Sequence, residues 1–299
     1  YGRETNPALK AHDNVFAFQN TRSCGTATAV SLPCMFSNYT RAEYSDTAGK
    51  STQNVIDVLG YAGIKTAWWD ANTGSKGIAA RTVEINYAAG DDSRFCVEGE
   101  CRDDILVDKL KQELPKVTEN TVFVLHLIGS HGPAYYMRYQ QDSAPFKPDC
   151  RTAAFADCTQ DQLVNAYDNT IAYTDKILGE VIDALNNQGE RINATMIYMS
   201  DHGESLGESG LYLHGAPWFI APDEQTYVPF LMWLSPHFIN SERVDTACLK
   251  TNAKNGGFSH DNLFHTILGN IEVETEVYDP NLDVLAPCIG PDMDEVVVR

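Results

Sequence analysis

The amino-acid sequence predicts an α/β fold with a largely parallel central sheet that helices cover on both faces. Two runs of apolar, β-prone residues, 122–128 and 195–199, are typical of buried strands. Between them, the apolar side chains of residues 159–188 recur at the spacing of one helix face. Strand-like and helix-like segments alternate along the whole chain, and this alternation is characteristic of parallel sheets with helical connections.

Local signals define the elements in order. The helix predicted at 51–62 begins near Ser51 and ends before Gly63, and the long helix begins at a capping box formed by Thr159 and Gln162. The other predicted elements are strands at 14–18, 64–69 and 227–234 and helices at 103–114 and 259–268. We expect the acidic tail after Asp279 to be peripheral. No repeat, low-complexity segment or flexible linker divides the chain, which predicts a single domain over residues 1–299.

Composition and charge exclude some partners. The chain is 43% hydrophobic, which is typical of globular proteins, and its formal net charge is -19. A nucleic-acid partner is excluded because its phosphates require a basic stripe, which the sequence lacks. Charge alone would not attract the protein to an anionic membrane either. An anionic substrate would therefore require local positive charge, which a bound metal ion supplies.

The eight cysteines indicate disulfides and an oxidising compartment. Six of them lie as near neighbours in the sequence, Cys24/Cys34, Cys96/Cys101 and Cys150/Cys158, and Cys248 and Cys288 remain. Eight cysteines permit many pairings, and we expect neighbours to pair. The chain has no apolar run long enough to span a membrane and begins at Tyr1, so we expect it to be the soluble part of a longer protein.

Polar side chains follow four predicted strands at the point where each strand ends. Asp201 and His202 follow 195–199, with His214 shortly after, and His131 follows 122–128. Asn72 and Lys76 follow 64–69, and Thr26 and Thr28 follow 14–18. If the strands are parallel neighbours, their carboxyl ends meet at one edge, where ligands bind in open α/β sheets. Asp201 and His202 would then bind a metal, with Zn²⁺ favoured by the nitrogen and oxygen ligands, and a threonine hydroxyl at that metal would become a nucleophile.

Each of these features has a simpler interpretation. A Ser or Thr before an Ala-rich segment is often only a helix cap. An isolated Asp-His-Gly is often a solvated turn, Lys76 a solvated surface lysine and His131 an idle loop histidine. His126, inside its strand, is expected to be a hydrogen-bonded core histidine.

Several motifs taken together resemble a known family. Residues 20–29 (Asn-Thr-Arg-Ser-Cys-Gly-Thr-Ala-Thr-Ala) and 200–208 (Ser-Asp-His-Gly-Glu-Ser-Leu-Gly-Glu), with 75–77, 129–136 and 165–169, closely resemble the periplasmic catalytic domain of lipid A phosphoethanolamine transferases. That family includes chromosomal and mobile colistin-resistance enzymes and belongs to the alkaline phosphatase/sulfatase superfamily. The resemblance extends over nearly the whole chain, and the tail with Cys248 and Cys288 is similar to the chromosomal branch.

The resemblance implies an α/β/α sandwich of alkaline phosphatase/sulfatase type and a two-step transfer. Thr28 matches the acceptor threonine that takes phosphoethanolamine from phosphatidylethanolamine and passes it to a lipid A phosphate. Thr28, Asp201 and His202 match ligands of the first zinc site, His131 and His214 match residues that bind the phosphoryl group or a second zinc, and Asn72 and Lys76 match substrate contacts. One or two Zn²⁺ ions, a monomer and polymyxin or colistin resistance are implied, at the periplasmic face of the Gram-negative inner membrane.

One departure from the family pattern concerns the metal. The family's remaining first-site ligand is a glutamate in a Gly-Glu-Thr-Ala-Arg motif upstream of the segment in which this chain begins, and Glu4 does not match it. The strand expected to carry that glutamate and the membrane-spanning part are also upstream. We therefore expect this chain to have a weakened or empty zinc site and an exposed sheet position.

Two other functions are consistent with the residues. A phosphodiesterase or sulfatase-like hydrolase of the same superfamily would transfer the covalent intermediate to water, although a sulfatase would normally use a modified Cys or Ser rather than Thr28. A secreted, disulfide-linked binding domain without catalysis is the third possibility, and replacement of Thr28 would leave its behaviour unchanged.

Overall fold

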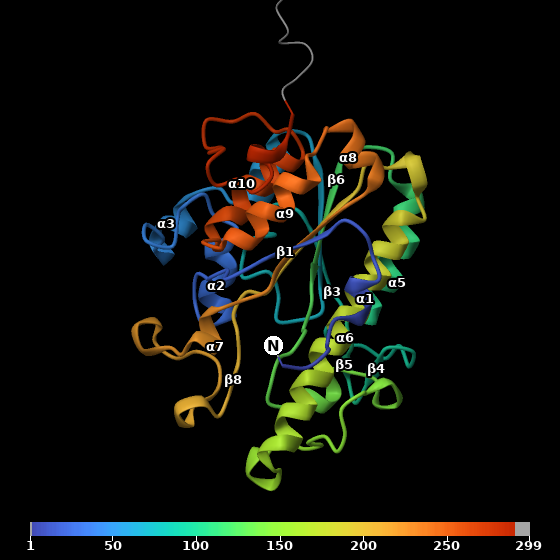
Figure 1. Cartoon of the computed structure of the whole chain (residues 1–299), viewed down its shortest axis with the longest axis vertical. Coiled ribbons are helices and arrows are strands. Elements are labelled where there is room, and N and C mark those ends of the chain that lie inside the picture. The colour runs from blue at the N-terminus through green and yellow to red at the C-terminus, as the bar shows by residue number, and fades with distance from the viewer. Residues whose placement is uncertain (1, 291–299) are drawn as a thin grey trace, which may run out of the picture.

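Two three-stranded sheets form the centre of the molecule in a computed structural model that describes residues 2–290 (Figure 1). One sheet has the order β3 (Val83–Asn86), β2 (Lys65–Asp70) and β6 (Thr121–His126), and its strands are parallel. The other has the order β1 (Val15–Phe18), β10 (Phe230–Leu234) and β7 (Thr195–Met199), and β10 is antiparallel to both neighbours. The α/β class is thus confirmed, with a parallel arrangement in the first sheet and a mixed one overall.

Helices cover both faces, as the side chains of β2 show. Trp68 packs into one apolar cluster with residues of α2 (Thr28–Met35), α4 (Val55–Tyr61) and α10 (Asp261–Asn270). Trp69 packs into another with residues of α5 (Asp104–Glu113) and α6 (Gln160–Asn186). Because neighbouring strand residues point to opposite faces, these two tryptophans mark the two helix layers of an α/β/α sandwich, which Figure 1 shows on either side of the strands.

The remaining elements are short. The other helices are α1 (Pro7–Lys10), α3 (Asp46–Ser51), α7 (Asp223–Thr226), α8 (Pro236–Ser241) and α9 (Thr246–Asn255). Two small antiparallel hairpins are formed by β4 (Cys96–Val97) with β5 (Glu100–Cys101) and by β8 (Ser205–Leu206) with β9 (Tyr212–Leu213). Helices α8 and α9 pack with β1 and β10 around a third apolar cluster.

Helix starts test the sequence signals directly. The capping box of Thr159 and Gln162 at α6 is confirmed, with both reciprocal hydrogen bonds present. The start near Ser51 is wrong, because Ser51 ends α3 and α4 begins after Asn54, which forms a capping box with Asp57. The sequence contains two cap signals close together here, and the later one has the acidic partner three residues on.

The expected disulfide pairing is confirmed at all four positions: Cys24–Cys34, Cys96–Cys101, Cys150–Cys158 and Cys248–Cys288. The first of these connects the loop before α2 to α2 itself. The last connects α9 to the segment near residue 288 and closes the longest loop.

The segment after Asp279 is not peripheral as far as residue 290. Val284, Leu285 and Cys288 are buried in the third cluster, and Asp283 is 2% exposed. The Cys248–Cys288 bond explains this position, because it brings the segment against α9. The last nine residues, 291–299, lie outside the described part of the chain. Within residues 2–290, no helix combines the length and apolar character needed to cross a bilayer.

Candidate active site

Thr28 is the first residue of α2, and its hydroxyl does not cap the helix. The N-cap residue is Ala27, which has no side chain that could accept a hydrogen bond from the helix. Thr28 Oγ1 lies instead 3.3 Å from Nε2 of His202. The helix-cap interpretation is therefore wrong for this hydroxyl, and residues from the front and the rear of the chain meet here.

Asp201 and His202 lie in the loop directly after β7. The Asp201 carboxylate Oδ2 is 3.7 Å from His202 Nε2, and this oxygen is buried without a hydrogen-bond partner. Burial acts to raise the pKa of Asp201, but the neighbouring His202 imidazole and the Thr28 hydroxyl outweigh it and hold that pKa below its ordinary value. A buried, ionised oxygen with no partner is costly unless a cation binds it, so this donor set fits a metal ion.

The backbone fixes the tautomers of two histidines at this position. His202 Nδ1 lies 2.9 Å from the Gly203 carbonyl oxygen, and His131 Nδ1 lies 2.7 Å from that of Gly132. A carbonyl only accepts, so each Nδ1 carries the proton and each Nε2 retains its lone pair. This is the arrangement that prepares imidazole as a metal or proton acceptor at Nε2.

His214 joins these two imidazoles in one group. Its ring centroid is 4.2 Å from that of His202 and 5.2 Å from that of His131. The structure thus brings together Thr28, Asp201, His202, His131 and His214. The strand-end prediction assumed parallel neighbouring strands, and that assumption is wrong, because β6 lies in one sheet while β1 and β7 lie in the other on either side of the antiparallel β10.

Glu204 belongs to the same group, although it is not among the residues predicted from the sequence. Its carboxylate oxygens lie 3.4 Å from Nδ1 of His214, and ligand atoms of His202, Glu204 and His214 lie within 4.8 Å of one another. The hydrogen bond from His214 to Glu204 raises the pKa of that imidazole against the opposing effect of burial. No local sequence signal identifies Glu204, because its burial and its contact with His214 depend on how the loop after β7 folds back.

His260 connects the two loops that carry the group, and it was also missed. The imidazole is buried; its Nδ1 accepts the N–H of Cys24, and its Nε2 donates to the carbonyl of Ser200, each at 2.9 Å. Cys24 precedes Thr28 in its loop, and Ser200 precedes Asp201. One side chain near the start of α10 therefore fixes the separation of the Thr28 and Asp201 loops.

A buried carboxylate holds the loop that carries His131 through backbone hydrogen bonds. Asp103, at the start of α5, accepts the N–H groups of Ile128 at 2.8 Å and Gly129 at 2.9 Å. Burial raises the pKa of Asp103 to about 6. Two backbone hydrogen bonds to one buried group position the chain that leads from β6 to His131.

Asn72 and Lys76 are not joined to the group by direct hydrogen bonds. The Asn72 amide donates to the carbonyl of Leu127, and Lys76 Nζ donates to both oxygens of Thr73 within its own loop. Their role as substrate contacts remains a prediction. His126 is the core histidine that we expected, since its Nδ1 lies 2.5 Å from the buried carboxylate of Asp70.

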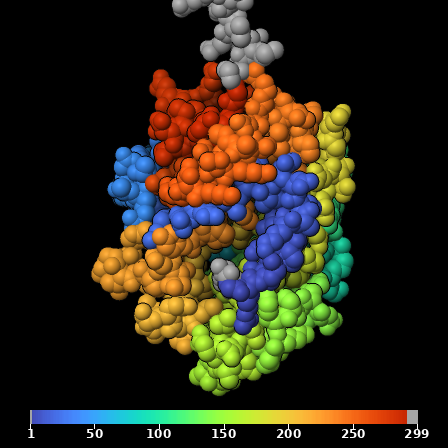
Figure 2. Space-filling view, in the orientation of Figure 1, coloured from blue at the N-terminus to red at the C-terminus, as the bar shows by residue number. Residues whose placement is uncertain are grey.

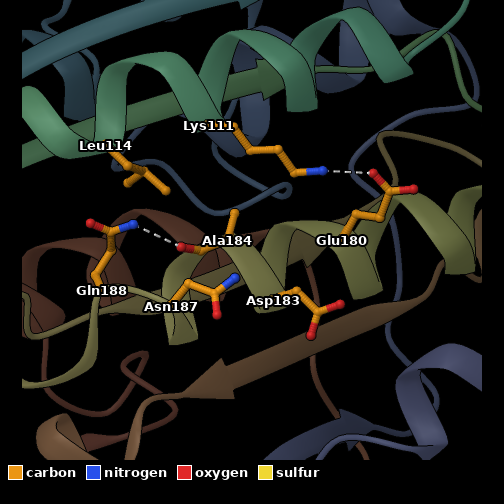
Figure 3. Close-up of a pocket in the computed structure, with 7 residues that line it drawn as sticks. All are labelled: Lys111, Leu114, Glu180, Asp183, Ala184, Asn187 and Gln188. Atoms are coloured by element: carbon orange, nitrogen blue, oxygen red, sulfur yellow. Dashed lines mark hydrogen bonds and ion pairs between the residues drawn. The ribbon is translucent and has the colours of Figure 1, made fainter.

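A surface pocket between α5 and α6 is separate from this group. It has a volume of about 220 Å³ and is lined by residues such as Lys111 and Glu180, which form an ion pair (Figure 3). None of the predicted site residues lines it. Its lining contains no imidazole, hydroxyl or thiol, and its one lysine is paired with Glu180.

Comparison with known proteins gives close relatives. The sulfatase family matches residues 1–273. Phosphoethanolamine transferase EptA of Escherichia coli strain K12 is 45% identical over 288 residues, which are 96% of this chain and 52% of that protein. The chain thus spans about half the length of the curated relatives that it matches.

Solved structures agree. Lipooligosaccharide phosphoethanolamine transferase A of Neisseria meningitidis is 40% identical and matches with a TM-score of 0.94, both as a soluble domain and as an integral membrane protein. These matches cover 97% of this chain and 87% and 55% of those chains. The periplasmic domain of EptC from Escherichia coli in complex with Zn shares the fold at 20% identity, with a TM-score of 0.76 over 96% of this chain and 81% of that one. The predicted alkaline phosphatase/sulfatase-like fold is confirmed.

Proposed function

The chain belongs to the sulfatase family and, within it, to the phosphoethanolamine transferases, and from this premise we propose that it transfers phosphoethanolamine from phosphatidylethanolamine to a phosphate of lipid A. The observation that supports this proposal most directly is the position of the Thr28 hydroxyl, 3.3 Å from His202 and beside the buried Asp201 carboxylate. A hydroxyl becomes a nucleophile when its proton is withdrawn by such a site.

Thr28, Asp201 and His202 are the residues that would hold Zn²⁺. Their donor atoms are a hydroxyl oxygen, a partnerless carboxylate oxygen and an imidazole nitrogen with a free lone pair, which is a set that zinc accepts. When bound, the ion lowers the pKa of the Thr28 hydroxyl and neutralises charge on the phosphoryl group. Glu204 and His214 lie beside this set, and their ligand atoms and one of His202 lie within 4.8 Å of one another.

The protein groups divide the transfer into two displacements. In the first, the Thr28 hydroxyl gives up its proton to water, its oxygen bonds to phosphorus, the bond from phosphorus to the diacylglycerol oxygen breaks, and that oxygen takes up a proton. His214, whose pKa Glu204 raises, is the donor that we assign to this proton, and His131 contacts the phosphoryl oxygens. In the second, a lipid A phosphate oxygen attacks the same phosphorus, the bond to Thr28 breaks, and the Thr28 oxygen and His214 take up protons from water. Asn72 and Lys76 orient the substrate.

The setting of this reaction follows from the substrates. Both are membrane lipids, which places the site at the periplasmic face of the Gram-negative inner membrane, with a membrane-spanning region in the longer protein. Addition of a cationic ethanolamine group to lipid A reduces its negative charge, so polymyxin and colistin bind less well. We expect a monomer.

Transfer to Thr28 is tested by mass spectrometry of the zinc-loaded protein after incubation with phosphatidylethanolamine. The expected result is one phosphoethanolamine adduct, mapped to Thr28, that disappears when lipid A is added while modified lipid A forms. Thr28→Ala should show neither product. Thr251→Ala, which removes a hydroxyl on α9 that bonds only to the Ala247 carbonyl, is the matched control and should behave as the parent.

Two outcomes would contradict the proposal. An adduct that water releases as free phosphoethanolamine, at a rate that lipid A does not change, would identify a hydrolase of the same superfamily. Lipid A modification that persists in Thr28→Ala would exclude the covalent threonine intermediate.

A further inference from the structure

A short apolar projection lies beside the site and has no protein partner within the described chain. It consists of residues 217–222, here called the 217–222 tip, and contains the turn of 3₁₀ helix Trp218–Ile220 between Pro217 and Pro222. Phe219 is 86% exposed and Ile220 is 60% exposed, and Phe219 is the most exposed large hydrophobic side chain of residues 2–290. Adjacent apolar side chains at such exposure usually indicate an interaction surface rather than chance.

The two residues just before the tip are hydrogen-bonded to the loop that carries Thr28. The Thr26 hydroxyl donates to the carbonyl of Ala216 at 2.7 Å, and the N–H of Gly215 donates to the carbonyl of Thr26 at 2.8 Å. Thr26 lies two residues before Thr28, and Gly215 follows His214. Figure 1 shows the segment between β8 and α7, which contains the tip, projecting from the body of the molecule, and Figure 2 shows the same segment at the surface. Whatever contacts the tip therefore lies at the edge of the active site.

Arg41 supplies a positive charge at the same place. Its guanidinium lies over the Trp218 ring, 3.6 Å from the centroid, and its buried Nε has no hydrogen-bond partner. Among residues 2–290, no carboxylate lies within ion-pair distance of it. Asp261 acts on the Arg41 guanidinium electrostatically without forming an ion pair, and its Oδ1 accepts the Arg41 backbone N–H at 2.8 Å.

Arg22 shows the contrasting arrangement. Its guanidinium also lies over an aromatic ring, that of Tyr227 at 3.5 Å, but it forms an ion pair with Asp223 at 2.8 Å. Of two arginines stacked on rings in this region, Arg41 is the one without an ion pair among residues 2–290. In a chain with a net charge of -19, such a cation is complementary to an anionic group from outside.

We propose that the 217–222 tip and Arg41 form a docking surface for a phospholipid bilayer. Phe219 and Ile220 enter the acyl region, Trp218 lies at the level of the headgroups, and Arg41 binds a lipid phosphate, which is the order in which these residue types distribute at membrane interfaces. The inference rests on the proposed function, because lipid substrates give the surface its purpose. The overall negative charge repels an anionic bilayer, so apolar insertion rather than charge supplies most of the affinity.

The test is sedimentation of the full 299-residue chain with sucrose-loaded vesicles of phosphatidylcholine and phosphatidylethanolamine. The parent protein should bind. Phe219→Ser with Ile220→Ser should weaken the vesicle partition coefficient by about tenfold or more, since two apolar side chains no longer leave water. Arg41→Gln should weaken it about twofold, the effect of one exposed ion pair with a lipid phosphate.

Matched controls separate this surface from general effects. Val83→Ser removes an apolar side chain that is 59% exposed on β3, and Arg22→Gln removes one charge that is already paired. Both should bind vesicles as the parent does. Equal losses in the controls, or no vesicle binding by the parent, would overturn the proposal. Concentration-dependent self-association that the Phe219/Ile220 substitutions abolish would overturn it too, by assigning the surface to a second copy.

Adduct formation on Thr28 with detergent-dispersed phosphatidylethanolamine keeps the two hypotheses distinguishable. The Phe219/Ile220 variant should form the adduct at the parent rate in detergent and lose rate only on vesicles. A parent protein that binds vesicles but never forms the adduct would refute the proposed function and leave the docking surface intact. Full adduct formation without vesicle binding would refute the docking surface and support the proposed function.

Discussion

The Cys248–Cys288 disulfide should contribute more to stability than any of the other three. It closes a loop with a sequence separation of 40, whereas Cys96–Cys101 has a separation of 5. The loss of loop-closure entropy in the unfolded chain gives about 4 kcal/mol for the long loop and about 2 kcal/mol for the short one. Each pair has one buried and one partly exposed cysteine, so the two removals are comparable in packing.

The measurement is urea unfolding of two double variants, Cys248→Ala/Cys288→Ala and Cys96→Ala/Cys101→Ala, monitored by circular dichroism. The free energy of unfolding should fall by about 4 kcal/mol in the first and about 2 kcal/mol in the second. Cys288 also packs beside Leu249 in an apolar cluster, which can only add to the first value. Equal losses, or a greater loss from the short loop, would refute the loop-entropy argument.

Three further predictions concern the loops of the site. Gly203→Ala should destabilise the protein by about 2 kcal/mol and weaken zinc binding in calorimetry, because the added Cβ would overlap the Glu224 carbonyl oxygen. Gly60→Ala is the control and should have neither effect, because its added Cβ meets nothing within 4 Å. Burial lowers the pKa of His260 to about 4, so its neutral form is fully stabilising above pH 6.5 and about 3 kcal/mol is lost as the pH falls toward 4. In the metal-free protein, His260→Gln should remove this loss of about 3 kcal/mol in the free energy of unfolding, measured by urea titrations at several pH values. An unchanged pH dependence of that free energy in the variant would disprove the assignment. Zinc should raise the melting temperature of the parent but not of Asp201→Asn, and an equal rise in both would place the ion elsewhere.

The sequence predicted the main site residues because strand ends are readable. Apolar runs locate β6 and β7, and the polar residues that follow them must lie at strand ends, so Asp201, His202 and His131 could be selected. Thr28 was selected by the same logic and by the family resemblance. Glu204 and His260 could not be, because their positions depend on how the 200–229 segment and α10 fold back on the site, and no local pattern encodes that.

Two features of the fold, the direction of one strand and the position of the segment after Asp279, also could not be predicted from local sequence patterns. Hydrophobic periodicity predicted the strand at residues 227–234, seen as β10, but it contains no information on direction, so the antiparallel pairing of β10 was not foreseen. The segment after Asp279 was judged by its acidic composition alone. Its buried residues are held by a disulfide to α9, and a long-range bond of that kind cannot be inferred from local charge.

The pairing of β7 with β10 determines how this site can vary among proteins. Met199 and Phe230 are directly opposite each other, so the chain leaves the sheet and returns to it at one point. Everything between them, from Asp201 and His214 to the exposed Phe219, is a single excursion anchored at a common base. Lengthening or shortening that excursion would leave the strand register unchanged. Because Asp201, His202 and His214 lie on this excursion, only its exposed part around Phe219 can vary without loss of the site, while the paired strands at its base keep their register.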